Sequence, residues 1–310
     1  MKTFPLLLTI SLCIAGCGHS TRGDPNGSDH SAYLIDGPSE AAAIKAAYQD
    51  TRPDCGGPSK PAFLCSGVIL RGTQESSDYH SWNPRPGNTG VSFSYLRKDA
   101  NFSHLAVRTD NGFIFYPVLG APSGKDHMSV LCSFPIDGYT SIRAQPGCGE
   151  STSYPVVSKR CQSQGITTAA QWKAHFDKGR SGANLALVYG YVCSFDVRDE
   201  MNTQGADSFY QSLQAMHLVP TDLVHRYNEL IIQAWAQNIP ARLPIRAFFY
   251  VADSGLKGAR HDQWDFFRST SPGIFIPIIK VSLPASVTGT ATFTYNPSDQ
   301  YCQPGAATCS

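Results

Sequence analysis

The chain has 310 residues, of which 42% are hydrophobic and 16% are charged, and its formal net charge is +1. Such a composition supplies a core for one large globular domain or two small ones. The near-neutral charge argues against nucleic acid or an anionic membrane surface as the binding partner. The 27 glycines and 21 prolines indicate many turns and favour a strand-rich architecture.

The first 16 residues are predicted to be a signal peptide. Lys2 is a minimal basic region, and the apolar run over 4–14 is too short to span a bilayer. The sequence IAGC at 14–17 resembles a bacterial lipobox, in which Cys17 would be lipidated after cleavage. The alternative is ordinary secretion with cleavage nearby. Both interpretations predict an exported protein, either secreted or held at the outer membrane as a lipoprotein.

Export determines how the cysteines are interpreted. Ten are present, of which Cys13 lies in the signal peptide and Cys17 at the processing site. The other eight are Cys55, Cys65, Cys132, Cys148, Cys161, Cys193, Cys302 and Cys309. In an oxidising compartment they predict up to four disulfides. Cys55–Cys65 and Cys302–Cys309 would close short loops, and the remaining connectivity stays open. Because the chain has no CxxC motif and no close pair of histidines, we expect no metal site.

The segment that follows the leader is predicted to be a flexible tether. Residues 17–38 are rich in Gly, Ser, Asp and Pro, so the fold is expected to begin at 39. Ser39 is predicted to cap the first helix. Helices are predicted at 40–50, 167–178 and 206–219, and the last two carry apolar stripes that would face a core.

Alternating patterns and short apolar runs predict the strands. They fall at 67–71, 90–96, 111–119, 127–134, 185–197, 229–235, 244–251, 273–283 and 291–295. The first strand ends at Arg71, after which Gly72 is expected to open a turn. The strand over 244–251 is expected to pair with the one over 229–235. Pro277 would move its strand to a sheet edge or a bulge.

Common catalytic motifs are absent from the sequence, which contains no GxSxG, no HExxH and no GxGxxG. The segment GAPSGKD at 120–126 resembles a phosphate-binding loop only in part. It is one residue short and has Asp126 where that loop needs Ser or Thr. Catalytic groups must therefore be sought among scattered polar residues on strands.

Polar residues at three places on the predicted strands are candidates. Arg71 ends the first strand, and Glu229 opens a later one. Ser92 and Ser94 share one face of the strand that follows Arg71, while Phe93 faces a core. Taken singly, they are most simply a surface arginine, polar decoration and a strand boundary. Their combination is more specific than any one of them.

This order of residues resembles that of ADP-ribosyltransferase-like enzymes. The blocks that carry the resemblance are LRGT at 70–73, GVSFSYL at 90–96, and NELIIQAW at 228–235 with the following PIRAFFYV. The resemblance implies an α+β fold, a split β-sandwich with flanking helices, stapled here by disulfides. The long separation of Ser92 from Glu229 implies a large insertion over 97–205 within a single domain of 39–310.

More closely, most of residues 55–295 are similar to the halovibrins, which are secreted bacterial proteins. The likeness runs through CSGVILRGT, SDYHSWNP, GVSFSYLRKDANF, NGFIFYP, NELIIQAW and DQWDFF. It implies cleavage of NAD at the nicotinamide–ribose bond. NAD would be the substrate, no cofactor would be needed, and the protein is expected to be a monomer.

The resemblance also implies roles for individual residues. Glu229 would stabilise the ribosyl oxocarbenium ion that forms as nicotinamide leaves. Ser92 would orient that carboxylate or the ribose, with Ser94 supporting it on the same face. Arg71 would bind the NAD diphosphate or the nearby ribose, a task that suits a planar guanidinium. Asn228, beside Glu229, is counted among the substrate-binding residues.

Two aromatic blocks have a functional and a simpler interpretation. In RHDQWDFF at 260–267, Asp262, Gln263 and Asp265 would lie on a loop over the cleft and position the acceptor or nicotinamide. The simpler interpretation is a helix turn or loop packed by its aromatic residues. In YHSWNP at 79–84, Trp82 would form an aromatic wall for nicotinamide, or would only pack its own loop.

Three functions remain to be distinguished. In an NAD glycohydrolase, water accepts the ADP-ribose. In a mono-ADP-ribosyltransferase, a protein of a host or competitor accepts it, and the segment 97–205 would recognise that target. The third function is a disulfide-stapled surface lipoprotein that binds without catalysis. The likeness to halovibrins favours the first.

Overall fold

The computed structural model describes residues 33–73, 91–105, 109–115, 126–138, 160–180, 191–197, 204–219, 227–236, 245–269, 273–286 and 288–301. All the described residues belong to one compact unit, Ala32–Ser310. The predictions for the signal peptide, Cys17, Trp82 and the Cys302–Cys309 pair lie outside the described residues.

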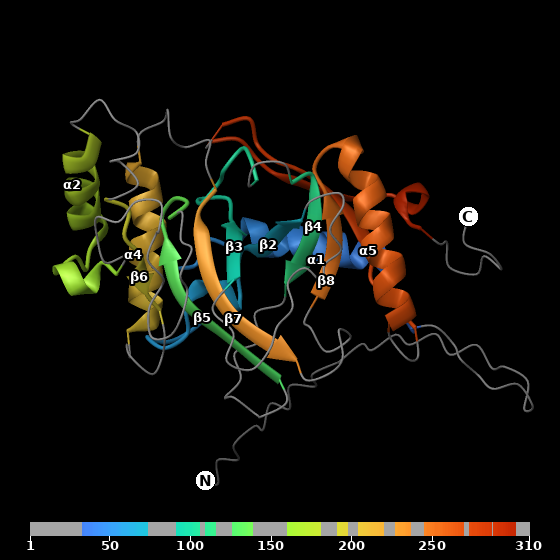
Figure 1. The fold of residues 1–310 in the computed structure, drawn as a ribbon, viewed down its shortest axis with the longest axis horizontal. Helices are drawn as coiled ribbons and strands as arrows, with labels where there is room; N and C mark the ends of the chain where they lie inside the picture. Colours follow the sequence, from blue (N-terminus) through green and yellow to red (C-terminus); the bar gives the residue numbers. More distant parts are fainter. Residues whose placement is uncertain are drawn as a thin grey trace, which may run out of the picture. The chain divides into compact units, whose positions relative to one another are not determined.

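A nine-stranded sheet forms the centre of this unit, with the strand order β11-β10-β8-β4-β2-β3-β7-β5-β6 (Figure 1). Its strands are β2 (Val68–Thr73), β3 (Val91–Leu96), β4 (Asn111–Phe115), β5 (Asp126–Phe134), β6 (Phe195–Asp196), β7 (Glu229–Ala236), β8 (Ile245–Tyr250), β10 (Ile278–Ser282) and β11 (Thr292–Tyr295). All neighbours are antiparallel except β10 and β8. The architecture is therefore mixed α+β with a large, mostly antiparallel sheet, in agreement with the predicted class.

Helices pack around the sheet. They are α1 (Gly37–Gln49), α2 (Ala169–Arg180), α4 (Gly205–Leu218) and α5 (Leu256–Ser269). α4 packs beside β5 and β6 with α2 next to it, whereas α5 packs against β8 and β4 (Figure 1). The predicted N-cap of the first helix is wrong. Asp36 caps α1, because its side chain accepts a hydrogen bond from the backbone N–H of Ser39 at 3.1 Å.

The fold begins earlier than the predicted tether allows. β1 (Tyr33–Leu34) pairs in parallel with β9 (Ile274–Phe275) in a separate two-stranded sheet. Residues 33–38 therefore belong to the folded unit rather than to a tether. The strand predicted over 273–283 is divided into β9 and β10, and Pro277 lies at the division, as its missing N–H would favour.

One long-range expectation is also wrong. β7 does not pair with β8, because β7 lies between β3 and β5, while β8 lies between β4 and β10. The segment 97–205, predicted to be a large insertion, contributes strands to the central sheet. It supplies β4, between β2 and β8, and β5, next to β7. It also supplies β6, at the edge of the sheet, and the helix α2.

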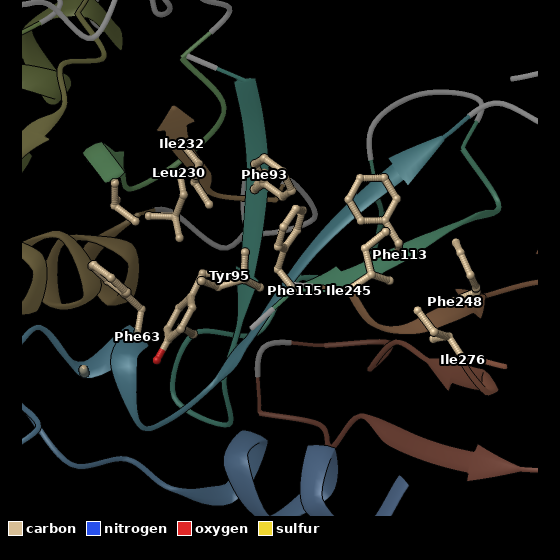
Figure 2. Close-up of a cluster of buried hydrophobic side chains, with 14 of the residues drawn as sticks. Phe63, Phe93, Tyr95, Phe113, Phe115, Leu230, Ile232, Ile245, Phe248 and Ile276 are labelled. Carbon is tan, nitrogen blue, oxygen red and sulfur yellow. The ribbon is translucent and has the colours of Figure 1, made fainter. Parts of the chain in front are cut away.

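β3 changes its backbone partner halfway along its length. Its first three residues pair with β7, from Val91 opposite Ile232 to Phe93 opposite Leu230. Its last three residues pair with β2, from Ser94 opposite Leu70 to Leu96 opposite Val68. The β2–β3 ladder thus ends where the β3–β7 ladder begins, and Figure 2 shows β2 and β3 diverging on the side of Phe93.

Aromatic side chains fill the core beneath this change of partner. Phe93 lies edge-on to Phe115 with ring centroids 4.9 Å apart, and Phe113 contacts both rings (Figure 2). Tyr95 lies edge-on to Phe209 of α4 at 5.1 Å. Burial of such rings is the main stabilising contribution to folding here.

Disulfides cross-link the segments around Cys55 and Cys161. Cys55 is bonded to Cys65, which confirms the predicted local loop, and Cys161 is bonded to Cys193. Cys132 is also disulfide-bonded. These bonds agree with the oxidising compartment predicted from the cysteine count.

Loss of the Cys161–Cys193 disulfide should destabilise the protein more than loss of Cys55–Cys65. The two loops span 32 and 10 residues. Loop entropy converts these lengths to about 3.7 and about 2.7 kcal/mol. Cys161 and Cys193 are also buried in a core cluster. Urea unfolding of Cys161→Ala/Cys193→Ala and Cys55→Ala/Cys65→Ala would test this, and equal losses in the free energy of unfolding would contradict it.

Candidate functional site

The three candidate catalytic residues lie on three consecutive strands. Arg71 is on β2, Ser92 on β3 and Glu229 on β7, and these strands are neighbours in the sheet. Ser92 is opposite Ile231, two residues into β7 from Glu229. The long separation of Glu229 in sequence therefore does not separate it in space.

Arg71 lies beside the point where the β2–β3 ladder stops. Its Nη1 donates a hydrogen bond to the backbone oxygen of Ser92 at 2.6 Å, and its guanidinium lies 5.9 Å from the ring centroid of Phe93. If the β2–β3 ladder continued, Gly72 would lie opposite Ser92. The Arg71 guanidinium instead supplies the hydrogen bond to the Ser92 oxygen that the backbone of β2 would have made. This contact holds the half-buried charge at the strand edge, between the two faces of the sheet.

β2 does not end at Arg71, as the sequence had suggested. Gly72 and Thr73 continue the strand and pair with Gly112 and Asn111 of β4. Gly72 is required here for close packing rather than for a turn. A Cβ at this position would lie 2.5 Å from the side-chain oxygen of Thr109.

Glu229 is almost fully buried, with 1% of its surface exposed. Its Oε2 accepts a hydrogen bond from the backbone N–H of Gly138 at 2.9 Å. Continuing the β3–β7 register by one pair places Ser94 opposite Glu229, so the two share a face of the sheet with Ser92. Arg71 belongs to the opposite face, together with Phe93. The Glu229 carboxylate and the hydroxyls of Ser92 and Ser94 therefore lie on one face of the sheet. The Arg71 guanidinium contacts the backbone of Ser92 at the edge of β3.

Asn228 has a structural role that differs from its predicted one. Its Oδ1 accepts from the backbone N–H of Tyr95 at 2.7 Å, and its Nδ2 donates to the carbonyl oxygen of Tyr95 at 2.7 Å. Nδ2 also contacts the sulfur of Met216 at 3.1 Å. Because its amide oxygen and nitrogen are both hydrogen-bonded to the backbone of Tyr95, Asn228 is committed to the protein rather than available to a substrate.

Tyr95 is itself held in place by the surrounding core. Its hydroxyl donates to the backbone oxygen of Ser66 at 3.0 Å, and burial raises the pKa of Tyr95 to about 12. Arg97 lies 5.9 Å from its ring centroid. The partner of Asn228 is therefore a neutral, rigidly packed residue over the physiological pH range.

The block RHDQWDFF forms part of helix α5, so the expected loop over a cleft is wrong and the simpler interpretation holds. Gln263 is buried and fully used within the protein. Its Nε2 donates to the oxygen of Ile276 at 2.7 Å and to Oε1 of Gln300 at 3.0 Å, and its Oε1 accepts from the N–H of Tyr301 at 2.8 Å. Asp265 is half-buried on the same helix.

Asp262 joins α5 to the sheet. Its side chain is fully buried, and its Oδ2 accepts from Nδ2 of Asn111 at 3.4 Å. The same Nδ2 donates to Oγ1 of Thr73 at 3.0 Å. This polar contact lies two residues beyond Arg71 on β2, at the packing interface of α5 rather than in a loop.

Sequence reasoning missed the groups that hold the candidate residues in place. The backbone N–H of Gly138 donates to Glu229, and the backbone N–H of Tyr95 donates to Asn228. The side-chain amide of Asn111 donates to Asp262. No local pattern could have identified them, because the partners are far apart in the chain; Asn228 and Tyr95 are 133 residues apart.

A scan against protein-family models found no matching family, and searches of curated proteins and of solved structures found no match. In the part of the chain that the structure describes, no helix is long and apolar enough to cross a membrane. Within the same residues, no group of three or more His, Cys, Asp or Glu side chains gathers as metal ligands would.

Gln263→Leu should lower the free energy of unfolding by about 2–4 kcal/mol, because it leaves buried backbone and side-chain groups without partners. Asp265→Asn, on the same helix but half-buried, is the control and should cost under about 1 kcal/mol. Chemical unfolding of the two variants would distinguish them. A Gln263→Leu variant as stable as the control would mean that Gln263 is not a structural residue.

Proposed function

We propose that this protein is an exported NAD glycohydrolase with an ADP-ribosyltransferase-like fold, which cleaves NAD to nicotinamide and ADP-ribose. The observation that carries the proposal is the strand order. In an enzyme of that class Arg71, Ser92 and Glu229 would surround one NAD, and these three residues lie on the consecutive strands β2, β3 and β7. Arg71 and Ser92 are in direct contact through the 2.6 Å hydrogen bond.

The chemistry requires a carboxylate near the ribose. When the bond from C1′ of the ribose to the nicotinamide nitrogen breaks, its electron pair leaves with neutral nicotinamide and an oxocarbenium ion remains. A fixed anionic group stabilises that cation. Glu229 suits this role because Gly138 and the β7 backbone hold it in one position. Water then bonds to C1′ and releases a proton to solvent, which gives ADP-ribose.

Arg71 would bind the diphosphate. A guanidinium offers a planar set of donors that matches phosphate oxygens, and Arg71 is already oriented by Ser92 and by the ring of Phe93. Ser92 and Ser94 would contact the nicotinamide ribose from the face that they share with Glu229. The disulfides are compatible with action outside the cell, where they form. A lipid on Cys17 would keep the enzyme at the outer membrane.

Glu229→Gln should keep the fold and reduce the rate of nicotinamide release from NAD by about 100-fold or more, because a neutral amide cannot stabilise the cation. Chromatographic analysis of the products would measure it. Asp177→Asn, an exposed acid on α2, is the matched control and should retain the native rate. A Glu229→Gln variant that released nicotinamide at the native rate would remove Glu229 from the mechanism.

The same product analysis separates the competing functions. Free ADP-ribose supports the glycohydrolase. Label transferred from NAD to an added protein would instead identify a transferase. Neither product with the native protein would leave only a binding role.

Arg71→Lys should raise the KM for NAD by about tenfold with little change in kcat, because an ammonium cannot make the paired contact with a diphosphate. Steady-state kinetics over a range of NAD concentrations would show the change. An unchanged KM would argue against diphosphate binding by Arg71, while leaving the role of Glu229 intact.

A further inference from the structure

Three consecutive residues at the start of β7 are held from both sides. Tyr227 is tied to the segment after β5, since its oxygen accepts from the N–H of Asp137 at 3.0 Å and its hydroxyl donates to Oδ2 of Asp137 at 2.9 Å. Glu229 is tied to the same segment through Gly138. Asn228, between them, is tied to β3 on the other side.

Asn228 forms the last link between β7 and β3. The backbone ladder of these strands begins at Leu230, opposite Phe93. The next rung toward the start of β7 consists of the Asn228 side chain and the backbone of Tyr95, with both bonds at 2.7 Å. Without that rung, Glu229 would be at a strand end that is paired with β5 alone.

The position of Glu229 matters as well as its presence. A carboxylate stabilises an oxocarbenium ion only where it lies close to the developing charge, and a displacement of about 1 Å can cost about 100-fold in rate. An amide that supplies both a donor and an acceptor to one backbone residue fixes residue 228 in register. It therefore also fixes the residue that follows.

We propose that Asn228 is a positioning residue that holds the Glu229 carboxylate in register for cleavage of NAD. This inference rests on the proposed function and deepens it. Asn228 acts through Glu229 and does not contact NAD, because both polar atoms of its amide are hydrogen-bonded to Tyr95. Its removal should therefore change the rate of the chemical step rather than the binding of NAD.

Asn228→Asp tests the proposal, since aspartate has the same size and can accept from the N–H of Tyr95 but, when ionised, cannot donate to its oxygen. We expect kcat for nicotinamide release to fall by about 10- to 100-fold, with KM for NAD within about twofold of native. Asn296→Asp makes the same chemical change at an exposed position directly after β11, at the edge of the sheet opposite β6, and should leave both constants unchanged.

A second measurement distinguishes a positioning role of Asn228 from a purely structural one, in which the substitution only destabilises the fold. The dissociation constant for ADP-ribose, measured by calorimetry on native protein, Asn228→Asp and Asn228→Ala, should stay within about twofold. Thermal unfolding of each variant should remain cooperative. A merely structural role would weaken ADP-ribose binding and lower kcat together, and that result would overturn the proposal.

The outcomes are distinct. An unchanged kcat in Asn228→Asp would overturn the positioning role, and a raised KM with unchanged kcat would show that Asn228 binds substrate instead. If the native protein released no nicotinamide from NAD, the proposed function would fall and the positioning role with it. If the native protein is active and Glu229→Gln is inactive, a native-like Asn228→Asp overturns the positioning role alone.

Discussion

The candidate site depends on one constraint: β3 does not pair with both β2 and β7 along its whole length. The strand gives its first half to β7 and its second half to β2. The backbone oxygen of Ser92 on the β2 side, and the backbone N–H and oxygen of Tyr95 on the β7 side, are therefore bonded to side chains rather than to a strand backbone. Buried backbone N–H and C=O groups must be hydrogen-bonded, so side chains take the missing places.

The two side chains that fill these places are the neighbours of the proposed chemistry. The Arg71 guanidinium bonds to Ser92 on the β2 side, and the Asn228 amide bonds to Tyr95 on the β7 side. Polar groups are thus drawn to the middle of an aromatic core, where isolated polar side chains would be costly. The same requirement that satisfies the backbone also places directional groups at the two strands that flank β3.

Local patterns predicted most elements, because periodicity and burial of one face are properties of a short segment. β3, β7, β11, α2 and α4 fall close to their predicted ranges, and the Cys55–Cys65 loop is present. The pairing partners of β7 and the helix α5 were not predicted correctly. Pairing depends on contacts between distant segments, and α5 carries its polar residues Asp262 and Gln263 on its buried face, contrary to the usual amphipathic pattern.

The exchange at β3 also constrains how the chain can fold. β2, β3 and β4 follow one another closely in sequence, so their pairing requires little loop closure. β7 joins β3 only after a long intervening segment, and until it does the residues Val91–Phe93 form an open strand edge with a large apolar side chain. Such an edge can pair with another chain. Folding speed and aggregation should therefore depend on how soon β7 docks, a step that the Asn228–Tyr95 rung completes.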